Sequence, residues 1–275
     1  MTAYLNDRFI DNSELTLHVS DLSMQRGYAI FDFLRTIKNV PLFFDDHLDR
    51  FYHSAKAMHL PVQQNREQLT SIIHQLIEQN DLPEAGIRIM LTGGYSADSY
   101  NPAQPNLIIT CNPVKTSTKE DFEKGYSIIT YEHQRELPYI KSISYLTAVW
   151  LQPLLREKKV NDVLYYNRQS ITEFPRCNVF VVTNDGKLVT PVHHMLKGIT
   201  RKQVLELAAA FMPVEERDIT VDELMSAAEV FLTATTKKII PVLKINDTII
   251  SSGKPGPVTT KLYEQFLALE QSLIS

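Results

Sequence analysis

Apolar residues recur at helical spacing in two stretches of the first half of the chain. These stretches contain Leu48, Phe51, Tyr52 and Ala55, and then Leu69, Ile72, Ile73, Leu76 and Ile77. The spacing places the apolar side chains on one face of a helix. Asn65 and Gln68 stand at capping-box spacing before the second stretch. We therefore expect two helices, the first beginning at Asp45-Asp46, that each pack on one face.

Alternating and β-branched segments flank these helices and predict strands. The predicted elements are hairpins over 4–10 and 33–44 and strands over 86–91 and 107–111. The two strands are separated by a loop from Gly93 to Pro105 that is rich in Gly, Ser, Asn and Pro. A loop of this length within a compact domain suggests a functional role.

The second half of the chain alternates irregularly between strand and helix patterns. The expected elements are strands over 126–131, 163–166, 230–233 and 239–243, a hairpin over 179–189, and helices over 145–158, from Thr200, from Thr220 and from Pro257. The hairpin turns on Asn184-Asp185-Gly186. Thr220 and Glu223 have capping-box spacing. This irregular order favours the α+β class.

The stretch over 115–121 is polar and has no apolar period, so we expect it to be structureless. It lies between the elements expected in the first half of the chain and those expected in the second. We therefore predict a domain over 1–114, a linker over 115–124 and a second domain over 125–275.

Composition excludes several classes of protein. The chain has a formal net charge of −4 at pH 7 with both signs interspersed, so it shows no basic surface for nucleic acid. No apolar run approaches a membrane span and the N-terminus lacks a signal peptide, which favours the cytoplasm. Two cysteines are too few for a disulfide framework. His193 and His194 are adjacent and cannot face one metal ion together, so we expect no metal site.

Lys141 stands within an apolar segment that runs from Leu137 to Leu146. Its ammonium could reach water while its stem covers apolar surface. Alternatively, a half-buried amine could form a Schiff base with an aldehyde cofactor. The residue alone favours the first interpretation, and the motifs that follow it favour the second.

Four motifs follow Lys141 in order: 171–180 (ITEFPRCNVF), 196–201 (LKGITR), 231–236 (FLTATT) and Pro241-Val242. With 31–35 (FDFLR) and 47–50 (HLDR) upstream, they resemble the class IV aminotransferases. That family includes branched-chain and D-amino-acid aminotransferases and aminodeoxychorismate lyase. The resemblance implies a fold type IV enzyme with a small N-terminal α/β domain and a larger C-terminal α/β pseudo-barrel domain. It also implies a homodimer, in which the loop over 93–105 reaches the partner's active site.

The resemblance assigns pyridoxal 5′-phosphate (PLP) as the cofactor. Lys141 matches the Schiff-base lysine, which also moves the proton at Cα. Glu173 matches the carboxylate that pairs with the pyridinium nitrogen and keeps the ring a good electron sink. Tyr145 matches a tyrosine that meets the phenolic oxygen in the branched-chain enzymes. The remaining cofactor-binding positions are matched to the phosphate, and they are Arg50, Gly198, Ile199, Thr200 and Thr235.

The resemblance places five residues near the substrate: Arg26, Phe31, Arg88, Arg176 and Thr236. Arg88 matches an arginine that binds the distal carboxylate of glutamate, and Thr236 matches a position that helps to hold the α-carboxylate. Arg26 and Arg176 depart from the usual pattern. We expect them either to bind a substrate carboxylate or to pair with acids such as Asp32 or Asp98.

The same positions bear on which reaction the chain catalyses. The loop over 95–100 lacks the arginine–histidine pair of the D-amino-acid enzymes, whereas Tyr145 and Arg88 favour an aminotransferase, with branched-chain amino acids among the candidate donors. A lyase that releases pyruvate and a non-catalytic binding protein are the alternatives.

Overall fold

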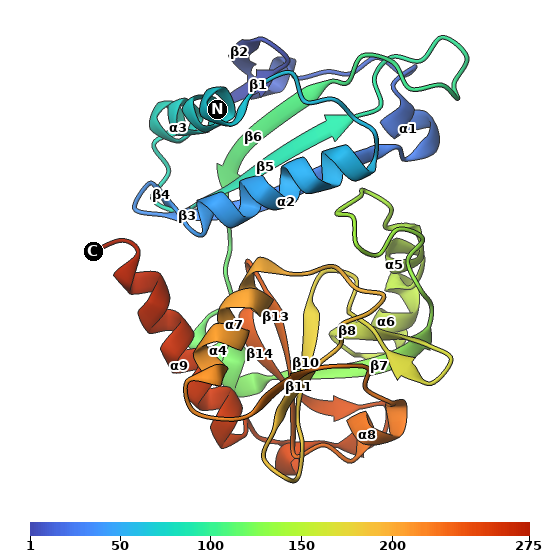
Figure 1. Ribbon diagram of the computed structural model, residues 1–275, viewed down its shortest axis with the longest axis vertical. Coiled ribbons are helices and arrows are strands. Elements are labelled where there is room, and N and C mark those ends of the chain that lie inside the picture. Colours follow the sequence, from blue (N-terminus) through green and yellow to red (C-terminus); the bar gives the residue numbers. More distant parts are fainter. The chain divides into compact units, whose positions relative to one another are not determined.

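A computed structural model describes residues 1–275, apart from the side chain of Ser251. The chain divides into two compact units. The N-terminal unit comprises Met1–Lys115, Ile140–Ser144 and Leu273–Ser275, and the C-terminal unit comprises Thr116–Tyr139 and Tyr145–Ser272. Each unit is built around its own β-sheet (Figure 1).

The N-terminal unit contains a six-stranded antiparallel sheet. Its strands are β1 (Thr2–Leu5), β2 (Arg8–Asp11), β3 (Ala29–Ile37), β4 (Val40–Pro41), β5 (Ala85–Thr92) and β6 (Leu107–Pro113). They lie in the order β2-β1-β6-β5-β3-β4. The hairpin predicted over 4–10 and the strands predicted over 86–91 and 107–111 are confirmed. The hairpin predicted over 33–44 has a shorter return strand, because helix α2 already begins at Phe44.

Two long helices cover this sheet (Figure 1). The helical segments of the unit are η1 (Asn12–Glu14), α1 (Leu22–Arg26), α2 (Phe44–Ala57) and α3 (Arg66–Asn80). The predicted apolar stripes are confirmed, since Phe51 of α2 and Ile73 of α3 are fully buried in the core that they share with the sheet. The capping box of α3 is also confirmed, because Asn65 and Gln68 each accept the other's backbone N–H.

The segment Ile140–Ser144 lies far along the chain but packs in the N-terminal unit. The N–H of Phe31 donates to the carbonyl of Lys141 at 2.9 Å, and the N–H of Ile143 donates to the carbonyl of Ala29 at 3.2 Å. Ile140 is buried in the core of the unit. Lys141 is thus fixed against the start of β3 by backbone hydrogen bonds.

The C-terminal unit contains a larger sheet that curls into a half-barrel. Its strands are β7 (Tyr126–Glu132), β8 (Asp162–Asn167), β9 (Ser170–Ile171), β10 (Asn178–Val182), β11 (Leu188–Thr190), β12 (Val214–Glu216), β13 (Glu229–Ala234), β14 (Lys238–Ile245) and β15 (Thr248–Ile249). They follow the order β12-β11-β10-β13-β14-β7-β8-β9, with β15 paired to β14. β7 is parallel to β8 and to β14, and β11 is parallel to β12. The strands predicted in this half are confirmed.

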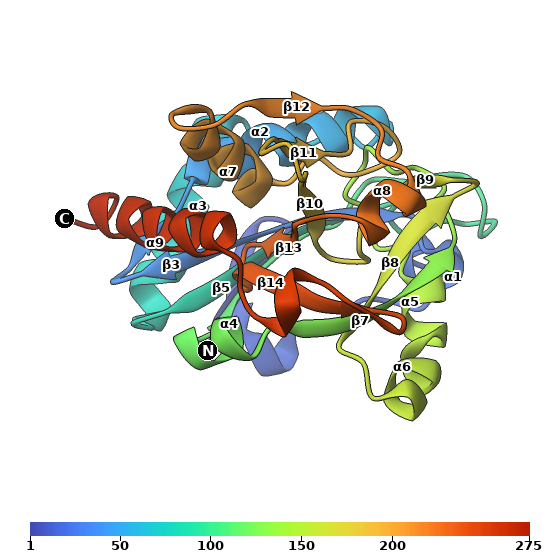
Figure 2. The same cartoon turned by 90° about the horizontal axis from the view of Figure 1, so that it is seen from below.

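The helical segments of the C-terminal unit are α4 (Lys119–Lys124), α5 (Leu146–Trp150), α6 (Gln152–Lys158), α7 (Ile199–Ala209), α8 (Val221–Met225), η2 (Ser251–Gly253) and α9 (Pro257–Ser272). α7 and α9 lie side by side against β13 (Figure 2). The helix starts predicted near Thr200, Thr220 and Pro257 are confirmed.

Three local expectations are wrong. The stretch over 115–121 is not structureless throughout, because Thr118 and Asp121 form a capping box that starts α4. The single helix expected over 145–158 is divided into α5 and α6, and Pro153 lacks the N–H that would continue the helical hydrogen bonds. The capping box at Thr220 is half formed, because the Glu223 carboxylate binds Arg217 instead.

The α+β class with a smaller N-terminal sheet and a larger C-terminal sheet is confirmed. Among the residues that the structure describes, no helix has the length and apolar character needed to cross a membrane.

Candidate active site

Lys141 has a defined environment in the N-terminal unit. Its side chain is neither fully buried nor fully exposed, and its Nζ lies 4.7 Å from the centre of the Phe31 ring. Its backbone N–H approaches the hydroxyl of Ser54 of α2 at 3.4 Å. A cation over an aromatic face is attracted by the ring quadrupole. The backbone pairing with β3 and the contact with the Phe31 ring together fix the position of the amine. A lysine that forms a Schiff base needs an amine held in this way.

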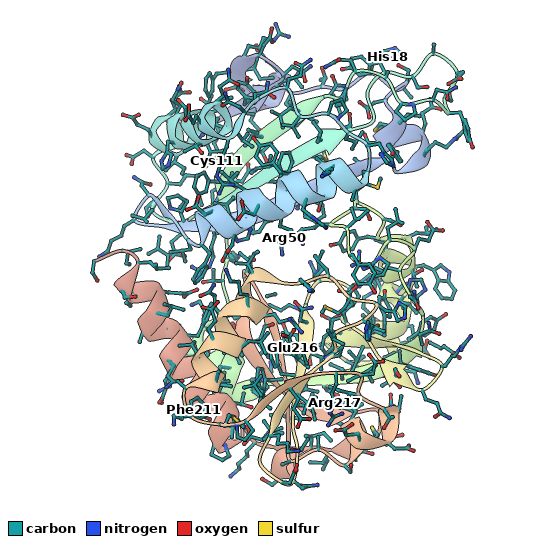
Figure 3. All side chains as sticks on the ribbon, viewed as in Figure 1. His18, Arg50, Cys111, Phe211, Glu216 and Arg217 are labelled. Carbon is teal, nitrogen blue, oxygen red and sulfur yellow. The ribbon has the colours of Figure 1, made fainter. Side chains whose placement is uncertain are left out.

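A buried acid organises the neighbouring face of β3 and α2. Asp32 is 0% exposed and accepts two hydrogen bonds from the guanidinium of Arg50, from Nε at 2.8 Å and from Nη2 at 2.9 Å. Arg50 projects from α2 (Figure 3). Burial alone would raise the pKa of Asp32, but the charge of Arg50 outweighs it and holds the pKa well below its usual range. Asp32 therefore fixes the orientation of the arginine matched to the cofactor phosphate.

His47 completes this cluster. Its Nδ1 lies 2.7 Å from Asp32 Oδ1. Burial lowers the pKa of His47 below its usual value, against the opposing charge of Asp32. The neutral imidazole then donates its Nδ1 proton to Asp32. The sequence did not predict this role, because an acid in a strand and a histidine in the next helix carry no spacing signal.

Arg88 of β5 lies opposite Phe33 of β3 in the sheet register. Its guanidinium carbon is 4.8 Å from the centre of the Phe31 ring and 6.0 Å from that of Phe33. Phe31 therefore contacts two cations, Lys141 and Arg88. The sequence-predicted substrate residues Phe31 and Arg88 are brought together with Lys141.

In the C-terminal unit, Glu173 is almost fully buried and both of its oxygens accept hydrogen bonds. Arg135 donates from Nε to Oε1 at 2.7 Å, and the N–H of Leu196 donates to Oε2 at 3.0 Å. Arg135 also donates from Nη2 to the carbonyl of Pro138 at 2.7 Å, which fixes the guanidinium. These contacts stabilise the negative charge of the carboxylate. The sequence predicted Glu173 but missed Arg135.

The start of α7 carries the residues that the resemblance matches to the cofactor phosphate. Gly198 precedes the helix, and no side-chain cap is present among the described residues. A Cβ at Gly198 would lie only 2.1 Å from Asn178 Oδ1, so a larger residue here would have to displace the Asn178 side chain. Helix N-termini attract anions through free N–H groups and the helix dipole. Gly198, Ile199 and Thr200 thus lie at a helix start, as the sequence predicted.

Thr233 lies near the end of β13, which pairs with β10 in the same unit, and Thr235 directly follows this strand. Thr233 faces Asn178 in the register, and its buried hydroxyl oxygen has no hydrogen-bond partner within the described part of the chain. Buried polar groups without a partner are rare in folded proteins. The buried Thr233 hydroxyl without a partner therefore fits a site that binds an anionic group such as a phosphate.

Two predicted residues are placed without the contacts expected for them. Arg26 ends α1, is exposed, and donates to the carbonyl of Gln25 at 2.9 Å. Arg176 lies exposed in the turn after Glu173. In the described residues neither arginine forms an ion pair, and of the acids considered as partners, Asp32 binds Arg50 and His47. Asp98 accepts hydrogen bonds within its own loop, including 2.9 Å from the N–H of Asn101, which lower its pKa.

Tyr145 and Thr236 belong to the C-terminal unit. Tyr145 directly precedes α5, whereas Lys141, four residues earlier, belongs to the N-terminal unit. Thr236 lies in the turn between β13 and β14, and its carbonyl accepts from the N–H of Ser117 at 2.9 Å.

The two adjacent histidines have other partners. His193 lies 3.0 Å from Asp218 through Nδ1, and His194 lies 3.2 Å from the side chain of Gln134. No group of three or more potential metal ligands occurs among the residues described by the structure.

Residues 29–245 match the family model described as Amino-transferase class IV, which is most of the chain. The chain belongs to the class IV aminotransferase family. The matched region contains Lys141, Glu173, Gly198 and Thr235.

Relatives of this aminotransferase fall into two groups. The D-alanine aminotransferase of Bacillus licheniformis is 29% identical over 281 residues, covering 100% of this chain and 98% of that protein. A putative branched-chain-amino-acid aminotransferase of Methanocaldococcus jannaschii is 28% identical over 274 residues, covering 97% and 95%. The solved branched-chain amino acid aminotransferase from Escherichia coli superposes with a TM-score of 0.88 at 24% identity, covering 98% and 93%. The identities do not separate the two substrate classes.

Proposed function

We propose that this class IV aminotransferase uses PLP, attached to Lys141, to move an amino group between an amino acid and a 2-oxo acid. The observation that carries the proposal is the placement of Lys141: a family-matched lysine is fixed by backbone pairing to β3, with its amine over Phe31. A lysine with a solvated surface role would need neither contact.

The chain's residues fit the parts of this cofactor. Glu173, held by Arg135 and the N–H of Leu196, offers a fixed negative charge for the pyridinium nitrogen. The start of α7 and the hydroxyls near the end of β13 offer donors for the phosphate. When bound, PLP supplies an electron sink that stabilises negative charge at the substrate Cα.

Lys141 carries the proton transfer in this proposal. Its amine would remove the proton from Cα of the donor and deliver a proton to C4′ of the cofactor. A single positioned base can carry out both transfers. Asp32 holds the guanidinium of Arg50, the arginine matched to the phosphate, so this fixed charge would orient the cofactor rather than react with it. Glu173 keeps its charge throughout.

We further propose that the amino donor carries a carboxylate that an arginine binds. Arg88 lies against the same Phe31 ring as Lys141, so a guanidinium and the reacting amine lie on one aromatic side chain. Arg26 and Arg176 carry charges without carboxylate partners among the described residues. A dicarboxylic donor such as glutamate, with branched-chain or other 2-oxo acids as partners, uses such charges best.

A homodimer is part of the proposal. Helix α5 leaves Leu146, Val149 and Trp150 exposed, at 82%, 67% and 66%. The N-terminal unit also exposes large apolar side chains, namely Val19 before α1, Met24 in α1, and Tyr95 and Tyr100 in the loop over 93–105. Exposed apolar side chains that gather on one element indicate contact surfaces. We propose that a second copy covers them and that the loop reaches the partner's active site. A Trp150→Glu variant that sediments as the wild type does would contradict the use of α5.

We also propose a cytoplasmic location, because Cys111 and Cys177 are both free thiols.

Borohydride reduction followed by peptide mapping tests the central claim. The cofactor should be fixed to the peptide that contains Lys141, and Lys141→Ala should lose both the label and transamination. A label on another lysine would overturn the assignment. Assaying pyruvate release from aminodeoxychorismate without an amino acceptor separates transfer from the lyase reaction, since an aminotransferase needs the acceptor.

A further inference from the structure

The turn between β13 and β14 is three residues long, from Thr235 to Lys237. Thr235 and Thr236 are the residues proposed to meet the cofactor phosphate and the substrate carboxylate. Lys237 directs its side chain elsewhere, to the first residue of β8. Its Nζ lies 2.9 Å from Oδ2 of Asp162. The turn that carries the two threonines is therefore tied by a side chain to a different strand.

This ion pair is shielded from water. The side chains of Lys237 and Asp162 are 15% and 9% exposed. The other carboxylate oxygen of Asp162 accepts the N–H of Val163 at 2.9 Å, which fixes the carboxylate. Lys237 Nζ also lies 4.9 Å from the centre of the Tyr126 ring at the start of β7. An ammonium with a carboxylate and an aromatic face on its two sides has little freedom to move.

The thiol of Cys177 is a further titratable group near Lys237, beside Asp162 and Tyr126. Burial raises the pKa of Cys177 to about 11, so the thiol stays neutral near pH 7. Burial alone would lower the pKa of Lys237, but the neighbouring acidic groups outweigh it and raise the pKa, so the ammonium stays charged. Asp162 is then the anion that compensates Lys237. Removing either Lys237 or Asp162 would leave the other as a buried charge without a counterion, which is strongly unfavourable.

The backbone of the turn is restrained by strand pairing at its two ends and by one hydrogen bond at its middle residue. Ala234 and Lys238 pair across β13 and β14, and the carbonyl of Thr236 accepts from the N–H of Ser117. Lys238 has a φ of 56°, in the left-handed region that favours glycine. A residue other than glycine keeps such a conformation only when its surroundings impose it. The ion pair of Lys237 with Asp162 involves the residue directly before Lys238 in the chain.

We propose that Lys237 is a positioning residue whose buried ion pair with Asp162 holds Thr235 and Thr236 in the conformation that binds the phosphate and the substrate carboxylate. The role of the two threonines rests on the proposed function. The fixing of the turn is a property of the chain that can be measured without the cofactor.

Hydrogen exchange measured by mass spectrometry on the full-length protein tests the fixing directly. In Lys237→Met, peptides that cover 234–238 should exchange at least about tenfold faster, as expected when a charge-assisted hydrogen bond is lost. Lys244→Met is the matched control, because Lys244 lies on β14 in an exposed ion pair with Asp247 at 3.9 Å. It should exchange as the wild type does. Asp162→Asn, alone and combined with Lys237→Met, should give the same acceleration, since one interaction is lost in each case.

Titration with PLP tests the consequence for binding. Lys237→Met should weaken PLP binding by at least about tenfold, and Lys237→Arg, which keeps the charge, should recover most of the affinity and also serves if the Met variant does not fold. If Lys237→Met lowers thermal stability while turn exchange and PLP affinity stay at wild-type values, the pair is only structural and the inference is wrong. If the turn loosens as expected but the wild type binds no PLP, the proposed function fails and the positioning of the turn stands.

Discussion

Arg135 Nε lies 2.7 Å from Oε1 of Glu173, and the same guanidinium is held by the carbonyl of Pro138. The carboxylate proposed to face the pyridinium nitrogen is therefore itself paired with a fixed cation. This pairing keeps Glu173 charged, since a buried carboxylate without a partner would be unfavourable. It also holds the carboxylate of Glu173 in one orientation.

Arg135→Met should lower turnover because Glu173 loses the donor that stabilises its charge. We expect kcat to fall by about ten- to a hundredfold, the loss of one charge-assisted hydrogen bond.

Glu173→Gln should keep the cofactor bound and lower kcat by about a thousandfold or more, since the ring nitrogen would lose the charge that holds its proton. Steady-state kinetics on cofactor-loaded variants measure both. If Arg135→Met and Glu173→Gln both turn over as the wild type does, Glu173 is not the pyridinium partner.

Arg135 shows where sequence patterns fail. It lies 38 residues from Glu173, and in the sequence it is one polar residue among several before Lys141. Its role depends on a loop that approaches Glu173 only in the folded C-terminal unit. A basic residue shortly before the reactive lysine was the only available signal, and it is a weak one.

Local patterns predicted the fold better than the site. The apolar stripe of α3 and the capping box at Asn65 are short-range features, so the sequence contains them in full. Pro153 was also visible, and it should have divided the helix expected over 145–158. The pairing of Ile143 with Ala29 depends on contacts more than a hundred residues apart, which no local period reports.

Stability should fall on acidification because of His47. Its pKa is lower in the folded protein than the ordinary 6.5, so the unfolded chain binds a proton first as the pH falls. The contribution is complete above pH 6.5 and is lost progressively below it, with a slope of up to about 1.4 kcal/mol per pH unit for one proton. His47→Asn keeps a donor towards Asp32 and should flatten the dependence of the unfolding free energy between pH 7 and 5. His53→Asn, at an exposed position of the same helix, should not. Equal slopes in both variants would contradict the assignment.

Gly198→Ala should weaken cofactor binding more than it destabilises the fold. Gly198 has a φ of −73°, which any residue adopts, so the backbone is not strained by the change. The added Cβ would lie 2.1 Å from Asn178 Oδ1 and would displace a side chain whose Nδ2 donates to the carbonyl of Leu196 at 2.7 Å. We expect PLP affinity to fall by about tenfold, the loss of one good contact to a charged group. Titration of the apoenzyme measures it. Asn178→Ser combined with Gly198→Ala should recover part of the loss, and failure of this rescue would argue against the steric explanation.

The three arginines assigned to the substrate make the most specific prediction, because they carry the choice between acidic and purely apolar donors. Arg88 contacts Phe31 beside Lys141, and Arg26 and Arg176 are exposed without carboxylate partners in the described structure. In the proposal, these guanidinium groups meet the substrate, where a carboxylate of the donor would compensate their charge.

Replacing each arginine by Leu should therefore lower kcat/KM for glutamate by about ten- to a thousandfold, the range for a lost charged hydrogen bond, with the largest effect at Arg88. Arg66→Leu, which breaks surface ion pairs of α3 with Asp45 and Asp49, is the matched control and should leave kcat/KM unchanged. A panel of L- and D-donors, acidic and branched-chain, measures the effect and the stereochemistry together. Should all three Leu variants keep wild-type efficiency while leucine or isoleucine remains the best donor, the arginines are structural and the donor is apolar. A loss restricted to Arg88→Leu would instead assign one carboxylate to the site beside Phe31 and leave Arg26 and Arg176 outside it.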